Sequence, residues 1–192
     1  MTASRIQAKL LLTGSGSVDP DALIEVFHEW IQRDRVADVL IDVADYRHVH
    51  QGPAVLLIGH TSDFGLDLAE GRAGLIHTSK RRSEDEAEPL RGVLAKLLQI
   101  AHLLEAEQGL GPIRFGTSEI LVRHLDGLAI VQGDIARKQA GDQLREMGRL
   151  LYGGEFEVEA VDSSAAYPAF VLRSSAPSLS TLPSLIERLA SG

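Results

Sequence analysis

The chain has 192 residues, of which 44% are hydrophobic and 24% charged, and 19 Lys and Arg against 27 Asp and Glu give a net charge of −8. This composition is typical of a soluble globular protein with one sizeable core, and it excludes a mainly disordered chain. The acidic balance weighs against nucleic-acid binding, since neutralising phosphates takes a basic surface. The absence of cysteine excludes disulfides, thiolate metal ligands and cysteine nucleophiles.

Neither a membrane segment nor a targeting segment is indicated by the sequence. No apolar segment approaches the roughly 20 residues that span a bilayer, and no N-terminal stretch resembles a signal peptide. We therefore expect a cytoplasmic protein that does not bind a membrane.

The N-terminal part predicts a strand, a helix and a second strand. Residues 6–12 form the first strand, and a helix follows in which Asp19 is the cap and Pro20 lies in the first turn. This helix ends near Arg33, and its apolar residues recur at helical spacing: Leu23, Val26, Phe27, Trp30 and Ile31. Residues 36–43 then predict a strand with Val39, Ile41 and Val43 on one side.

A meander of short strands is expected over residues 53–79. Residues 55–58 are apolar throughout and fit either a strand or one buried helical turn, and their length and flanking glycines favour the strand. Residues 64–68 alternate in polarity and lead through a turn at Gly71 to residues 73–78, which predicts a hairpin.

A long helix is predicted to begin at Pro89 and to keep an apolar face through Leu104. The alternative start, Ser83 with a capping box, would place Pro89 in the helix interior at a cost of ~3 kcal/mol. Next, Asp126-Gly127 between residues 119–125 and 128–131 is a strong two-residue hairpin signal.

The C-terminal third predicts a helix over residues 135–151, capped by Asp134 and closed by Gly153-Gly154, and then two strands at 156–161 and 169–173. Because helices and strands do not alternate regularly, we expect one α+β domain over residues 1–173. Its sheet should be largely antiparallel, with three main helices packed on it. Residues 174–192 read as a Ser/Pro-rich linker and a short amphipathic helix.

The densest group of chemically active side chains lies between Asp42 and Asp67. His48 and His50 are two residues apart, so in an extended segment both imidazoles project from the same side. If residues 51–53 make a tight turn, His60 and Asp63 supply a third and a fourth ligand for a divalent transition metal such as Zn, Fe or Mn.

Two other interpretations of this segment stay open. In the first, Asp42, Asp45 and Tyr46 bind a ligand without a metal. In the second, the whole group consists of solvated polar side chains on a meander. A serine hydrolase triad is not favoured, because Ser62 lies next to His60 and Asp63 in sequence and neighbouring side chains on a strand point apart.

The C-terminal helix carries the apolar residues Leu182, Leu185, Ile186 and Leu189. A linker followed by an amphipathic helix can present that helix to a groove on a protein partner. Alternatively, the same residues cover an apolar patch of their own sheet or of a second subunit, and this self-docking alternative is favoured.

Residues 36–82 resemble a family of uncharacterised bacterial proteins. The resemblance is carried by Ile41-Asp42-Val43-Ala44-Asp45-Tyr46, by Leu56-Leu57-Ile58-Gly59-His60 and by Gly71-Arg72-Ala73-Gly74-Leu75. It implies a bacterial cytosolic protein, and it implies no activity and no site residue.

The sequence favours a non-enzymatic binding or protein-interaction module that forms a homodimer through its sheet or long helix. The alternative is a metal-binding protein or metal-dependent enzyme that uses the His/Asp group of residues 42–67, with Asp45 hydrogen-bonded to a metal ligand or acting as general base.

Overall fold

The computed structural model describes residues 5–14, 18–49, 53–68, 71–80, 89–125, 127–161, 168–176 and 180–191. Its elements are, in chain order, β1 (Ile6–Leu12), α1 (Pro20–Gln32), β2 (Leu40–Asp45), β3 (Pro53–Gly59), β4 (Ser62–Asp67), β5 (Gly74–Ser79), α2 (Pro89–Ala106), the short 3-10 helix η2 (Gln108–Leu110), β6 (Phe115–His124), α3 (Gly127–Tyr152), β7 (Phe156–Val161), β8 (Ala169–Ser174) and α4 (Leu182–Ser191).

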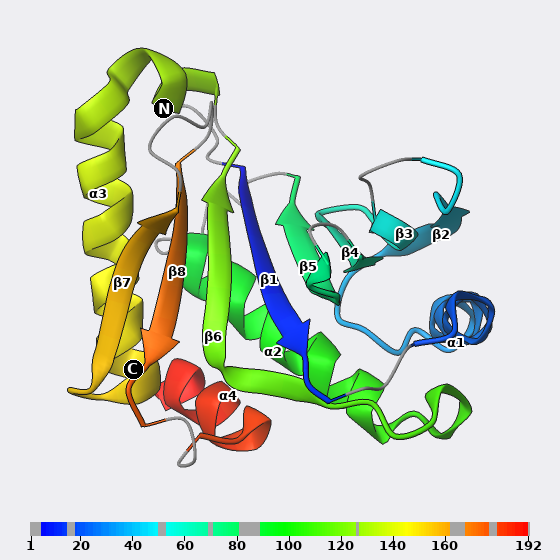
Figure 1. Cartoon of the computed structure of the whole chain (residues 1–192). Helices are drawn as coiled ribbons and strands as arrows, with labels where there is room; N and C mark the ends of the chain where they lie inside the picture. The colour runs from blue at the N-terminus through cyan, green and yellow to red at the C-terminus, as the bar shows by residue number, and fades with distance from the viewer. Residues whose placement is uncertain are drawn as a thin grey trace.

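The eight strands form one sheet in the order β2-β3-β4-β5-β1-β6-β8-β7. Every pair of neighbours is antiparallel. The N-terminal strand β1 lies between β5 and β6 and so joins the β2–β5 meander to the C-terminal strands (Figure 1). The prediction of an α+β fold with a largely antiparallel sheet is confirmed.

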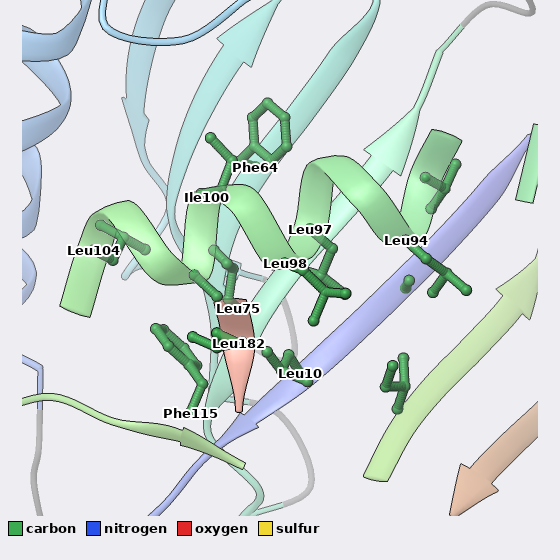
Figure 2. Close-up of a cluster of buried hydrophobic side chains, with 14 of the residues drawn as sticks. Leu10, Phe64, Leu75, Leu94, Leu97, Leu98, Ile100, Leu104, Phe115 and Leu182 are labelled. Atoms are coloured by element: carbon green, nitrogen blue, oxygen red, sulfur yellow. The ribbon is translucent and has the colours of Figure 1, made fainter. Parts of the chain in front are cut away.

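One face of the sheet holds the hydrophobic core. Alternate residues of β1, namely Ile6, Ala8 and Leu10, are buried on this face together with their cross-strand neighbours. The helix α2 lies behind the central strands in Figure 1 and sets its apolar residues on them. Figure 2 shows this layer, in which leucines of α2 meet residues from several strands and Leu182 from α4. Because the face is continuous, the helices share a single core.

Helix α1 begins and ends where the sequence signals place it. The carboxylate of Asp19 accepts a hydrogen bond from the backbone N–H of Asp21 at 3.0 Å, and Pro20 occupies the first helical position. Its face toward the core is formed by Leu23, Val26, Phe27 and Trp30, all of them buried. Trp30 also donates through Nε1 to Glu107 at 2.8 Å, which ties α1 to the end of α2.

The predicted hairpin at Asp126-Gly127 is wrong, because α3 begins at Gly127 and includes residues 128–131. An apolar run of four residues fits a strand and a buried helix segment equally well, and here it continues into a long helical stretch. The predicted end is confirmed: Gly153 follows the helix with φ +76°, and its N–H donates to the carbonyl of Arg149 at 3.0 Å.

The predicted strand over residues 36–43 begins later, at Leu40. The register shifts between Leu40 and Asp42, so the regular alternation expected for Val39, Ile41 and Val43 is interrupted. Val39, just before the strand, is 69% exposed, and Ile41, on β2 at the edge of the sheet, is 58% exposed. Residues 36–39 instead form the connection from α1, which borders the cavity described below.

Helix α4 packs against α2 and α3. Its start is fixed by Thr181 and Ser184, each of which accepts a hydrogen bond from the backbone N–H of the other, at 3.0 and 3.3 Å. Its last turn is bound to α2, because Arg91 Nε donates to the carbonyl of Leu189 at 2.8 Å. In the described part of the chain, no helix is both long enough and apolar enough to cross a membrane.

Candidate functional site

The histidines predicted as metal ligands lie at two ends of a hairpin. In the β2–β3 pair Asp45 is opposite Val55 and Leu40 is opposite Gly59, so the turn that contains His48 is at one end and His60 is at the other. The seven residues of β3 separate these ends by about 20 Å, at roughly 3.3 Å per residue. Both histidines are exposed. His50 lies outside the described residues.

The predicted acidic residues are engaged elsewhere. Asp63 forms an ion pair with Lys80 at 2.6 Å, and Asp45 binds Arg47, also at 2.6 Å. Hydrogen bonds from the side chain and backbone of Arg47 lower the pKa of Asp45 to about 2. The exposed Asp42 accepts a hydrogen bond from the N–H of Val43 at 2.8 Å.

Tyr46 is 37% exposed, and its ring centroid lies 6.3 Å from that of His48. Among the residues with described positions, no three His, Asp or Glu side chains converge so that they could hold a metal ion. The metal site therefore remains a prediction that depends on residues beyond this set.

The apolar residues of the C-terminal helix lie within the protein's own core. Leu182, Leu185 and Leu189 are at most 4% exposed, and Ile186 is half-buried against the same core. This placement is the self-docking alternative of the sequence analysis. A partner that binds through these side chains would have to displace α4 from α2 and α3.

A polar cluster that the sequence analysis did not identify lies beside α2. It consists of Asp38 from the α1–β2 connection, Thr61 and Ser62 from the start of β4, and Lys96 from α2. Lys96 Nζ donates to Thr61 Oγ1 at 3.3 Å and to Ser62 Oγ at 3.4 Å. Thr61 Oγ1 in turn donates to Asp38 Oδ2 at 2.8 Å. A chain of hydrogen bonds thus connects the ammonium to the carboxylate.

The carboxylate of Asp38 packs closely against the backbone at Val39 and Gly59. Its second oxygen, Oδ1, accepts the N–H of Val39 at 2.9 Å. A Cβ atom at Gly59 would lie 2.7 Å from the carbonyl oxygen of Ser62 and 3.1 Å from Asp38 Oδ2. Only glycine leaves room for the carboxylate there. The sequence signal for this cluster is weak, because its members are spread over three segments.

A cavity of about 290 Å³ opens between the α1–β2 connection and α2. Its surface is mostly apolar: the half-buried Val36 and Leu103 form the wall, and the buried Phe64 and Ile100 close the floor. Figure 2 labels Phe64 and Ile100 among the buried side chains of the core. The other lining residues are Arg35, Ala37, Asp38, Lys96, Gln99 and His102.

Behind the cavity floor lies His77 of β5, which is 1% exposed and stacks on Phe64. Its Nδ1 is 2.9 Å from the carbonyl oxygen of Val93, so Nδ1 carries the proton and donates. Burial, with a smaller contribution from the charge of Lys96, lowers the pKa of His77 to about 4. The imidazole is therefore neutral near pH 7 and adds no positive charge behind the floor.

This arrangement suits binding better than covalent catalysis. Ser62 is 1% exposed and is a hydrogen-bond partner of Lys96, so its hydroxyl does not face the cavity as a free nucleophile. His60 is exposed on the turn before β4, and Asp63 is bound to Lys80, so these neighbours of Ser62 form no triad with it. No protein-family model matches the chain, and no curated protein gives a significant match to it.

Proposed function

We propose that this chain is a non-enzymatic binding protein whose cavity beside α2 takes a small, mainly apolar molecule. The observation that supports this proposal is the half-buried Lys96, which stands at the border of a mostly apolar cavity of about 290 Å³. Ligand sites in proteins are concave and largely apolar, with a few fixed polar groups that orient the ligand.

The polar groups of the cavity are held in place before any ligand arrives. Thr61 and Ser62 fix Lys96, and Val39 and Thr61 fix Asp38. A ligand therefore meets side chains that have already lost much of their rotamer freedom, which lowers the entropic cost of binding. Such preorganised groups are the arrangement that a binding site requires.

The proposal is tested by titrating the ¹⁵N-labelled protein with a neutral apolar probe, 4-methylpentanamide. We expect chemical-shift changes concentrated in the backbone amides of residues 35–38 and 96–103. Ala37 is exposed and lines the cavity, so Ala37→Trp should block the probe without disturbing the core. The matched control is Ala190→Trp, on the exposed side of α4. Shifts elsewhere, or shifts that survive Ala37→Trp, would contradict the proposal.

The homodimer is proposed separately from the cavity. The sheet face opposite the helices carries exposed charged side chains of β7 and β8, among them Glu159 and Arg173, and this face is the one that a second copy would cover. Light scattering over a range of protein concentrations tests it: a mass that stays at one chain overturns the dimer.

The metal alternative is tested by elemental analysis of untagged protein, with His48→Ala and His60→Ala as variants.

A further inference from the structure

We infer that the cavity selects a small monocarboxylic acid with a compact apolar body, and that Lys96 binds its carboxylate. This inference rests on the proposed binding function and adds the chemical class of the ligand. It follows from the partners that the charged side chains around the cavity already have.

The ammonium of Lys96 has one N–H donor that neither Thr61 nor Ser62 accepts. An ammonium has three N–H donors, and two of them are given to Thr61 Oγ1 and Ser62 Oγ at 3.3 and 3.4 Å. Both distances exceed the usual range of about 2.7–3.2 Å for N–H···O bonds. Within the described residues Lys96 forms no ion pair, so its charge meets hydroxyl oxygens and no carboxylate directly. A ligand carboxylate would supply the missing negative charge.

Asp38 does not neutralise Lys96 by contact. Its two oxygens already accept the N–H of Val39 and the hydroxyl of Thr61, and Thr61 stands between the carboxylate and the ammonium. Arg35 also lines the cavity at its exposed rim. The lining therefore carries two positive side chains against one negative side chain, which favours a ligand with one negative charge.

The remainder of the cavity defines the rest of the ligand. Val36 and Leu103 offer an apolar wall above the floor of Phe64 and Ile100. A volume of about 290 Å³ lies at the lower end of ligand pockets, which span about 300–1,000 Å³. A doubly charged phosphate would place one of its charges near Asp38 and leave the apolar wall unused. A compact aliphatic or aromatic acid fits both parts of the site.

The experiment compares four probes, each titrated at pH 7 against the full chain: 4-methylpentanoate, its near-isosteric amide 4-methylpentanamide, its 2-amino derivative leucine, and inorganic phosphate. We expect the acid to bind about tenfold more tightly than the amide, since a charge-assisted hydrogen bond contributes more than about 1.4 kcal/mol. Lys96→Met should remove this preference, so that acid and amide bind with similar affinity, and Lys96→Arg should restore much of it. Lys138→Met, which removes an exposed charge on α3, is the matched control.

The outcomes separate this inference from the proposed function. Equal binding of acid and amide, both lost in Ala37→Trp, would overturn the carboxylate inference and leave the binding function intact. Tighter binding of leucine than of the acid would overturn it as well, because Asp38 would then recognise an ammonium group. If neither acid nor amide binds, both proposals fail. Thermal unfolding of Lys96→Met shows whether the variant is folded, and if it is not, the comparison of acid with amide on the unmodified chain decides.

Discussion

The imidazole of His77 stacks on the ring of Phe64, with the ring centroids 4.6 Å apart and the ring planes 18° from parallel. The two residues are cross-strand partners in β5 and β4. In the described part of the chain, Nε2 of His77 is buried and has no hydrogen-bond partner. A protonated ring at this position would place an uncompensated charge between an aromatic ring and α2.

The first prediction concerns acid stability. Burial lowers the pKa of His77 from 6.5 to about 4 in the folded chain, so the unfolded chain binds more protons between these pH values. The free energy of unfolding should therefore fall as the pH drops from about 6.5 to 4, by up to about 3 kcal/mol from this group. Urea unfolding at several pH values measures it.

The matched variant is His77→Leu, which places an apolar side chain that cannot be protonated behind Phe64. Its unfolding free energy should depend less on pH over the same window. A profile as steep as that of the wild type would show that other groups cause the acid sensitivity.

The second prediction contrasts two ion pairs of similar length. Lys9 and Asp67 lie 2.8 Å apart with side chains 4% and 9% exposed, whereas Arg145 and Asp142 lie 2.6 Å apart and are about half exposed. Removing one partner of a buried pair leaves a charge in a low-dielectric environment, so Lys9→Met should cost about 3 kcal/mol. Arg145→Ala should cost less than about 1 kcal/mol.

A double-mutant cycle checks that the loss at Lys9 reflects the pair. The change in Lys9→Met/Asp67→Asn should be smaller than the sum of the single changes by at least about 1 kcal/mol. Additive changes would mean that Lys9 stabilises the sheet through packing of its stem and not through Asp67.

Most elements could be predicted from the sequence because local signals and burial agree. Asp19 and Pro20 set the start of α1, Pro89 is the first residue of α2, and Gly153 follows the end of α3. The error at residues 128–131 has a local origin: four apolar residues carry no distinguishing period, and a dipeptide with a strong hairpin preference precedes them.

The site could not be predicted in the same way, because it depends on long-range placement. Asp38, Thr61 and Lys96 come from segments separated by more than twenty residues, and only the sheet register and the packing of α2 bring them together. For the histidines predicted as metal ligands, closeness in sequence does not bring the side chains together. His48 and His60 are close in sequence, but an intact strand lies between them and carries them to opposite ends of a hairpin.

The third prediction concerns α4. Leu185 is fully buried against the shared core, so Leu185→Ala should lower the free energy of unfolding by about 2–5 kcal/mol. The exposed Glu187 on the same helix is the control, and Glu187→Ala should change it by less than about 0.5 kcal/mol. If Leu185→Ala left stability unchanged, α4 would not belong to the folded core, and a role in docking a partner would regain support.

The fourth prediction uses two glycines in the interior of α3 that differ in their surroundings. A Cβ atom at Gly148 would lie 2.4 Å from the ring of Phe156 and 3.0 Å from Leu172, whereas one at Gly141 would meet its nearest neighbours at 3.7 Å. Alanine is favoured over glycine in a helix by about 1 kcal/mol, so Gly141→Ala should stabilise the chain by up to that amount. Gly148→Ala should destabilise it despite the same gain, because the Phe156 ring must move and with it the contact between α3 and β7. Thermal and urea unfolding measure the stability of the two variants. Equal stabilisation by both would show that α3 does not pack against β7 as closely as these distances indicate.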